Sequence, residues 1–241
     1  MIPWKRLDRV ELPDGGNLEL YARGHEFAIR ANGEELMGSR EHGSEEKLAE
    51  LGCAHVKDVA GARVLVGGLG MGFTLRATLD VLRSDARIDV AELVPAVVRW
   101  NRETLGPLAN HPLGDRRVTV IEQDVRDPIR RAEGRYDAIL LDVDNGPDGL
   151  VVESNDSLYG HAAMPHLWRA LKPGGVLAVW SVSDDRRYTS RLRRGGFDTR
   201  TVLAPARGTR GRAHVIWIAT KNTTPAGRST KGSPRKPRKA R

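Results

Sequence analysis

Beyond residue 60, the chain alternates between short, continuously apolar runs and segments with helical spacing. A strand at the start of 63–76 leads through a glycine-rich turn into a helix over 73–82. Further strands are expected over 87–90, 118–121, 136–141 and 176–181, helices over 162–171 and 185–194, and a closing strand pair over 197–203 and 214–219. This alternation predicts an α/β fold with a doubly wound, Rossmann-like, mostly parallel sheet of seven strands.

The first fifty residues have a different pattern. Strands are expected over 18–23 and 27–31, Asn32 and Gly33 form a hairpin turn, and 34–37 continues the meander. A short helix over 44–51 is expected to stop at Gly52. The chain thus divides into a β-meander with a short helix (1–52), a Rossmann-like domain (53–220) and a tail (221–241). A meander in this place is a lid, a dimer surface or both, and a homodimer through it is one expectation.

The turn after the first buried strand contains Gly68, Gly70 and Gly72, at every second position. Glycine lets the backbone turn sharply there, and a ligand can approach without meeting a Cβ. The following helix start directs unpaired N–H groups toward such a ligand. Glycine in a strand-to-helix turn also serves geometry alone, so this motif needs support from the other strand ends.

Acidic residues follow the next three predicted strands. Glu92 stands twenty residues beyond Gly72, where a carboxylate can accept hydrogen bonds from both ribose hydroxyls. Asp124 and Asp142 follow the strands at 118–121 and 136–141. Because the carboxyl ends of parallel strands lie along one edge, these side chains together favour a ligand site over three separate helix caps.

The segment 142–160 contains five acidic residues and no Lys or Arg. A negative loop beside the ligand edge would attract a cationic substrate, and an ordinary solvated loop is the equally weighted alternative. Asp142 and Asp144 stand one residue apart, so both can serve one site only if the chain turns there. Gly146 and Pro147 favour such a turn.

The glycine turn, Glu92, the Gln-Asp-Val at 123–125, YDAILLD at 136–142, Leu158-Tyr159 and LKPGGVLAV at 171–179 together resemble the class I S-adenosylmethionine-binding (methyltransferase) fold, and within it the spermidine synthase-like branch. The similarity covers most of residues 10–220. The resemblance implies a polyamine aminopropyltransferase that uses decarboxylated S-adenosylmethionine, or a relative that uses S-adenosylmethionine itself.

The resemblance also implies roles for individual residues. Gly68, Gly70 and Gly72 would approach the amino acid or aminopropyl end of the cofactor, Glu92 would hold the ribose, and Asp124 with Val125 would contact the adenine. Asp142 would accept a proton from the attacking amine, with Asp144 as the second acid. The substrate side would include Asn145 and Tyr159.

Three positions depart from the pattern of that branch. Met71 stands where an aspartate usually pairs with the aminopropyl ammonium. The acidic substrate loop has its second carboxylate shifted, or replaced by the amide of Asn145. The Tyr-His-Glu usually found after the meander has His42 and Glu46 as its nearest candidates.

Three functions remain open from the sequence. Polyamines are protonated at pH 7 and attack carbon only when neutral, so a transferase must attract the cation and remove a proton, which Asp142 and Asp144 could do. Methyl transfer to a small or cationic acceptor is the second hypothesis, since Met71 leaves room near the cofactor carboxylate. The third is a non-catalytic cofactor-binding module that its tail recruits to nucleic acid.

Composition changes this picture little. The 241 residues carry a formal net charge of +8, and the tail at 221–241 accounts for all of it with eight Lys or Arg and no acid. We expect this tail to be disordered and to make at most weak, salt-dependent contacts with nucleic acid. The single cysteine, Cys53, excludes intrachain disulfides and is expected to be structural. We expect no metal, no membrane association and a cytoplasmic location.

Overall fold

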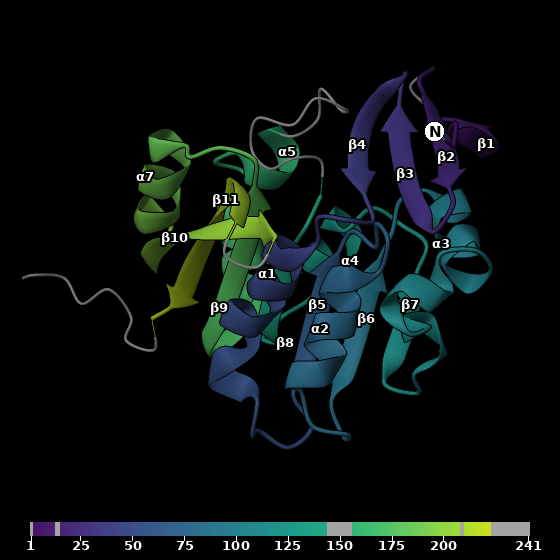
Figure 1. Ribbon diagram of the computed structural model, residues 1–241. Helices are drawn as coiled ribbons and strands as arrows, with labels where there is room; N and C mark the ends of the chain where they lie inside the picture. Colours follow the sequence, from purple (N-terminus) through teal and green to yellow (C-terminus); the bar gives the residue numbers. More distant parts are fainter. Residues whose placement is uncertain (1, 13–14, 144–155, 208–209, 223–241) are drawn as a thin grey trace, which may run out of the picture.

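A seven-stranded sheet forms the centre of the protein in the computed structural model, which describes residues 2–12, 15–143, 156–207 and 210–222 (Figure 1). Its strand order is β10-β11-β9-β8-β5-β6-β7, with β11 antiparallel to both of its neighbours and the other pairings parallel. The strands are β5 (Arg63–Gly67), β6 (Arg87–Ala91), β7 (Val118–Ile121), β8 (Tyr136–Leu141), β9 (Leu171–Ser181), β10 (Phe197–Arg207) and β11 (Arg210–Lys221).

Helices cover both faces of this sheet, because the central residues of its inner strands are mostly apolar on both sides. Val64 and Val66 pack on one face with α1, α2 and α3, whereas Leu65, between them, packs on the other face with α4, α6 and α7. This arrangement confirms the predicted doubly wound α/β fold. The helices are α1 (Gly43–Cys53), α2 (Phe73–Val81), α3 (Pro95–Arg102), α4 (Arg126–Arg131), α5 (Asp156–Tyr159), α6 (Met164–Ala170) and α7 (Arg186–Arg194), with short 3-10 turns η1 (Ala54–Val56), η2 (Gly106–Ala109) and η3 (Pro112–Gly114).

The amino-terminal segment forms a separate antiparallel sheet in the order β1-β2-β3-β4. Its strands are β1 (Lys5–Glu11), β2 (Asn17–Arg23), β3 (Glu26–Ala31) and β4 (Glu34–Gly38). The meander is therefore confirmed, with one strand more than expected. The sequence pattern missed β1 because this edge strand is mostly exposed and its sequence, KRLDRVE, shows little apolar alternation.

The small sheet lies over the carboxyl edge of the large one (Figure 1). Asp8 of β1 accepts hydrogen bonds from Trp100 Nε1 (2.7 Å) and Arg99 Nη2 (2.6 Å) of α3. Met37 of β4 packs on Gly70, with its Sδ 3.2 Å from the place a Cβ would occupy. The small sheet thus covers the glycine turn that the sequence singled out.

Two of the differences from the expected boundaries concern segments that contain glycine. Helix α1 continues through Gly52 to Cys53, because Gly52 is the point of closest approach to the large sheet: a Cβ there would collide with the Leu140 side chain. Burial raises the pKa of the Cys53 thiol to about 12, which agrees with a structural role. The Lys-Pro-Gly-Gly segment, which separates the expected helix over 162–171 from the expected strand over 176–181, lies inside β9, whose pairing with β8 is irregular there.

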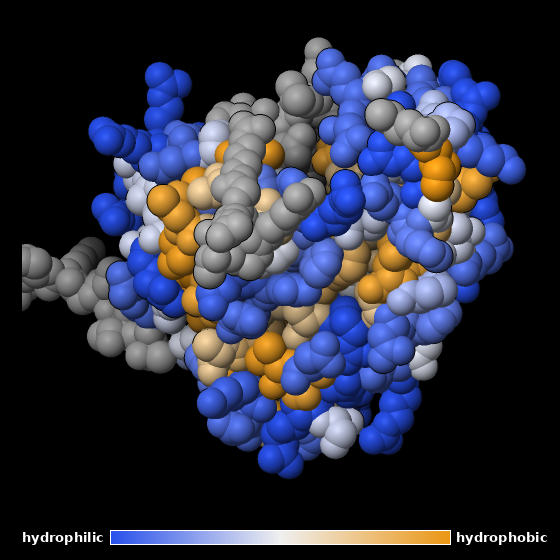
Figure 2. All heavy atoms as spheres, viewed as in Figure 1, coloured by the Kyte–Doolittle hydropathy of each residue, from blue (hydrophilic) through white to orange (hydrophobic). Residues whose placement is uncertain are grey.

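Hydrophilic residues cover most of the face shown in Figure 2, and apolar residues form small separate patches on it. The large apolar side chains exposed in the described segments are scattered over the chain: Ile2, Leu7, Val59, Leu93 and Leu203. None of the helices described is long and apolar enough to cross a membrane.

Candidate active site

The glycine turn connects the carboxyl end of β5 to α2. Gly68, Gly70 and Gly72 all have positive φ, at 87°, 50° and 87°, a region that other residues rarely adopt. A Cβ at Gly68 would collide with the Asp142 carbonyl oxygen, and one at Gly72 would lie 3.0 Å from Asn101 Oδ1. Backbone conformation and close packing therefore both require glycine in this turn.

Glu92, directly after β6, holds the glycine turn in place. Its buried carboxylate accepts hydrogen bonds from the backbone N–H groups of Leu69 (2.9 Å, at Oε2) and Val94 (2.9 Å, at Oε1). Each carboxylate oxygen can accept more than one hydrogen bond, so a ribose could still be held there. Leu93 beside it is 53% exposed and offers an apolar surface for a base, a feature that the sequence reasoning did not use.

Asp124 follows β7 and accepts hydrogen bonds from Arg126, the first residue of α4. Oδ1 accepts from the Arg126 backbone N–H (2.8 Å), and Oδ2 accepts from the guanidinium at Nε (2.9 Å). Although burial raises the pKa of Asp124, the hydrogen bonds from Arg126 lower it below the ordinary value. Val125 is buried and packs on Gly67 at the end of β5. Contact of Asp124 and Val125 with adenine stays a prediction.

Asp142, directly after β8, is a half-buried acid of the site. Its backbone N–H donates to the Gly67 carbonyl (2.9 Å), and its Oδ2 accepts from Thr74 Oγ1 of α2 (2.5 Å). Burial raises the pKa of Asp142, and the Thr74 hydroxyl opposes that rise. The buried Tyr159 donates its hydroxyl to the Val143 carbonyl (3.2 Å), which ties the residue after Asp142 to α5.

Glu45 is a second acid of this site, and the sequence reasoning missed it. Burial raises its pKa, and the charge of Asp142 raises it further, so Glu45 belongs to the surroundings of Asp142. Ser44 Oγ donates to Glu45 Oε2 (2.8 Å), and Ser44 Oγ is also 2.9 Å from His214 Nδ1 of β11. The first turn of α1 therefore brings an acid to the carboxyl edge of the large sheet.

The nearest candidates for the motif after the meander lie at the same helix start. His42 Nδ1 is 2.8 Å from Glu46 Oε1, and the His42 ring stacks on Phe73 at the start of α2, with the ring centroids 4.2 Å apart. Glu46 is thus paired with His42, whereas its neighbour Glu45 interacts with Asp142. Two adjacent acids, at 45 and 46, begin α1 in the sequence, and only the packing of α1 against the sheet distinguishes them.

Not every residue that the sequence singled out can be placed at the site. Met71 is buried in the core and supplies no charge at the position of the usual aspartate. Asp144, Asn145, Gly146 and Pro147 fall outside the described residues, as does the tail from 223 onward; Lys221 is the last residue of β11. In the described part of the chain, no three His, Cys, Asp or Glu side chains group as metal ligands would.

Comparison with curated protein sequences finds relatives that match about half of this chain. No protein-family model matches the chain. A polyamine aminopropyltransferase of Prochlorococcus marinus (strain MIT 9313) is 32% identical over 124 residues, which are 51% of this chain and 41% of that protein. Polyamine aminopropyltransferase 1 of Streptomyces coelicolor is 34% identical over 126 residues, 51% of this chain and 22% of that protein. The chain thus spans less than half the length of these curated relatives.

Solved structures share the fold over almost the whole chain. A spermidine synthase in complex with the transition-state analogue AdoDATO matches with a TM-score of 0.69 at 17% identity, covering 92% of this chain and 74% of that one. Spermidine synthase from Thermotoga maritima matches with a TM-score of 0.70 at 17% identity and the same coverage. A probable spermidine synthase from Corynebacterium glutamicum has a TM-score of 0.66 at 19% identity, with 94% and 83% covered.

Proposed function

We propose that this chain, which is related by fold and by distant sequence similarity to the spermidine synthase and polyamine aminopropyltransferase family, transfers an aminopropyl group from decarboxylated S-adenosylmethionine to a polyamine. The observation that carries the proposal is the Asp142 carboxylate, which Thr74 Oγ1 holds beside the glycine turn, where Asp142 also packs on Gly68. Glu45, whose pKa the charge of Asp142 raises, is the second acid. Both curated relatives are named for this transfer, and one structural neighbour binds a transition-state analogue.

The residues present suit such a sulfonium nucleoside. The glycine turn has no Cβ atoms at Gly68, Gly70 and Gly72, so its backbone can approach a ligand closely, and the Glu92 carboxylate has acceptor capacity for ribose hydroxyls. Once bound, the sulfonium group supplies an activated carbon and a neutral leaving group. The protein then has to align the amine with that carbon and receive one proton.

The acid pair suits the amine. A carboxyl group whose pKa is raised by burial holds a proton more readily than an exposed one, so Asp142 is matched to accept the proton that the attacking amine loses. A polyamine cation near the pair would favour the ionised forms of both acids and be attracted by them. Thr74 Oγ1 fixes the Asp142 carboxylate on one side, which leaves its other oxygen for the amine.

Methyl transfer from S-adenosylmethionine is the second candidate function. Met71 favours it, because the turn lacks the carboxylate that would pair with an aminopropyl ammonium, and the Met71 side chain is packed in the core. Both candidates use the same glycine turn and Glu92. They differ in the product released from the nucleoside.

The test incubates the purified full chain with putrescine and, separately, with each form of the cofactor. Methylthioadenosine from the decarboxylated form supports aminopropyl transfer, and S-adenosylhomocysteine from the carboxylated form supports methyl transfer. Release of neither product contradicts both and leaves a non-catalytic binding module. Asp142→Asn should abolish the aminopropyl product, whereas the matched control Asp198→Asn, an exposed acid on β10, should not change the rate.

A further inference from the structure

The amino edge of the large sheet, opposite the candidate active site, carries a row of arginines. Arg63 and Arg87 are the first residues of β5 and β6, while Arg117 and Arg135 directly precede β7 and β8. The strand order β8-β5-β6-β7 makes these four strand starts neighbours. With adjacent strands about 4.8 Å apart, the four side chains begin close together. We call these four residues the arginine row.

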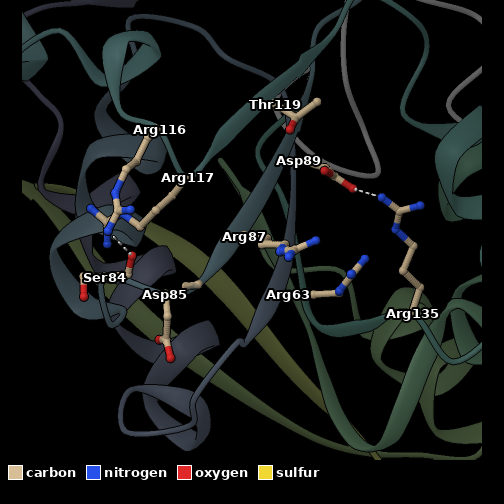
Figure 3. Close-up of a pocket in the computed structure, with 10 residues that line it drawn as sticks. Arg63, Ser84, Asp85, Arg87, Asp89, Arg116, Arg117, Thr119 and Arg135 are labelled. Carbon is tan, nitrogen blue, oxygen red and sulfur yellow. Dashed lines mark hydrogen bonds and ion pairs between the residues drawn. The ribbon is translucent and has the colours of Figure 1, made fainter.

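The arginine row, together with Arg116, lines a cavity of about 460 Å³ (Figure 3). In that view the Arg63 and Arg87 side chains lie together, between Arg116 on one side and Arg135 on the other. Two acids, Asp85 and Asp89, also line the cavity, so its lining carries five arginines against two carboxylates.

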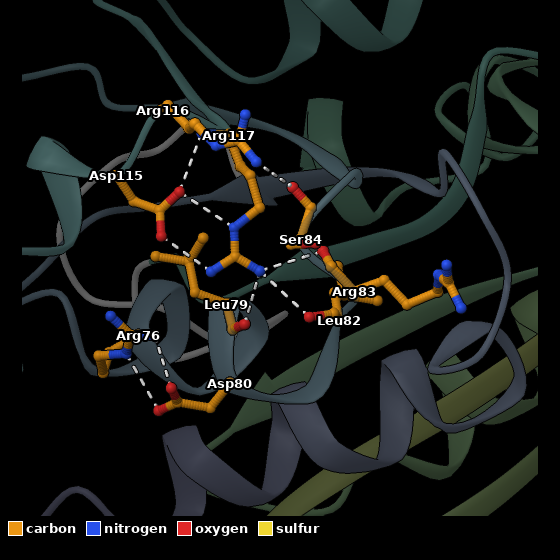
Figure 4. Close-up of polar contacts among 9 residues, drawn as sticks. All are labelled: Arg76, Leu79, Asp80, Leu82, Arg83, Ser84, Asp115, Arg116 and Arg117. Atoms are coloured by element: carbon orange, nitrogen blue, oxygen red, sulfur yellow. Dashed lines mark hydrogen bonds and ion pairs between the residues drawn. The ribbon is translucent and has the colours of Figure 1, made fainter.

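Two members of the row are used to build the cavity walls. Arg117 makes a two-pronged contact with Asp115 (3.0 and 2.8 Å), and its Nη1 donates to the carbonyls of Leu79 (2.9 Å) and Leu82 (3.1 Å) at the end of α2 (Figure 4). Arg135 donates to Asp89 (2.7 Å), which also accepts from the Tyr136 hydroxyl (2.9 Å). These contacts hold both walls in a fixed geometry.

Arg63 and Arg87 have a different position. They are register partners on adjacent parallel strands, so two like charges stand side by side, an arrangement that destabilises a sheet unless an opposite charge lies between them. Within the described segments, neither guanidinium group has an ion pair or a hydrogen bond. The nearby Asp89 is occupied by Arg135, and Asp137 by Lys172 (2.7 Å) and the Arg63 backbone N–H (2.8 Å).

We propose that this cavity binds a small anion with two or more phosphate groups, held between Arg63 and Arg87. The planar guanidinium fork matches phosphate oxygens, and the strand register places Arg63 and Arg87 side by side, so both forks can reach one ligand. The cavity volume lies in the range of small-molecule sites and suits an oligophosphate or a nucleotide end. A nucleic-acid strand would instead need an open basic groove.

The test measures binding of inorganic tripolyphosphate to the full chain by isothermal titration calorimetry, with citrate at equal ionic strength as a control anion. We expect saturable binding of one tripolyphosphate, weakened at least tenfold by Arg63→Gln combined with Arg87→Gln. The matched control is Arg200→Gln, which removes an exposed arginine on β10, at the other side of the same sheet. It should leave the affinity unchanged, and any background from the basic tail is common to all variants.

Three outcomes would overturn the proposal. Equal affinity for citrate would show a general response to charge. An equal loss of tripolyphosphate affinity in Arg200→Gln and in the double variant would also show a general response to charge. Binding of a short oligothymidylate, but not of tripolyphosphate, that disappears in the double variant would assign the arginines to a nucleic-acid surface instead. Circular dichroism of both variants checks that each is folded.

Discussion

The Thr74 hydroxyl sets how readily Asp142 is ionised. Burial raises the pKa of Asp142, and the hydrogen bond from Thr74 Oγ1, at 2.5 Å, opposes that rise by stabilising the carboxylate. Thr74 is itself buried, so Thr74→Val removes the donor while nearly keeping the shape of the side chain. We therefore expect the pKa of Asp142 to rise further in this variant.

The size of the change follows from the charge on the acceptor. A hydrogen bond to a charged group contributes about 1.5–3 kcal/mol, and one pKa unit corresponds to about 1.4 kcal/mol. Loss of this hydrogen bond should therefore raise the pKa of Asp142 by about 1–2 units. Only the ionised carboxylate can accept the proton of the amine. The acid limb of the pH–rate profile should therefore move about 1–2 units toward higher pH, with a smaller change at alkaline pH.

Two measurements check this expectation. One is the pH profile of methylthioadenosine release, and the other is carbon-13 NMR titration of the Asp142 carboxyl group, which needs no activity. Thr74→Ser keeps the donor and should behave as the unmodified chain does. Thr78→Val, one turn along α2, removes a hydroxyl that donates to the Thr74 carbonyl (2.7 Å) and not to Asp142. An unmoved titration in Thr74→Val, or an equal shift in Thr78→Val, would refute the reasoning.

Two further predictions concern stability. Burial raises the pKa of Glu45, so the ionised carboxylate lowers the free energy of unfolding as the pH rises from about 4, where Glu45 ionises in the unfolded chain, toward its pKa in the folded chain. Glu45→Gln should therefore raise the free energy of unfolding at pH 8 and not at pH 4. Urea titrations at the two pH values measure this difference. Gly72→Ala should lower the free energy of unfolding by about 1–3 kcal/mol in the same titration, because alanine is strained in the left-handed conformation and its Cβ would contact Asn101. Its control Gly33→Ala, with the same φ of 87° but open space around it, should lose only the strain part, and an equal loss in both would remove the packing argument.

Most of the fold could be predicted from the sequence because the strands of the large sheet are buried on both faces. Such strands are continuously apolar and easily distinguished from amphipathic helices, as YDAILL at 136–141 shows. β1 lacks that signal, because it is an exposed edge strand. The predicted end of the first helix at Gly52 was wrong for another reason. Glycine at the end of a helical pattern usually ends the helix, whereas here it lets α1 approach Leu140 and Ala178 closely.

The candidate site was predictable only where its residues stand within three positions after the end of a strand. Glu92, Asp124 and Asp142 each stand at a strand end, so their position in the sequence gives their position at the sheet edge. Glu45 comes from a helix start, and its approach to Asp142 depends on how α1 packs, which no local pattern encodes. The pairing of Asp124 with Arg126 likewise follows from side-chain geometry within one helix turn.

The parallel sheet explains why charges of opposite sign gather at its two edges. Residues that follow β5, β6 and β8 meet at one edge, and residues that precede or begin them meet at the other, whatever the distance between them in the sequence. β5 is five residues long, so the edges are about 16 Å apart at 3.3 Å per residue. That exceeds the Debye length of about 8 Å at physiological salt, so exposed charges at one edge act weakly on the other. An exposed anion at the arginine row and an exposed cation at the opposite edge should therefore have little effect on each other's affinity. The two edges can bind ligands of opposite charge because the strands between them keep them apart.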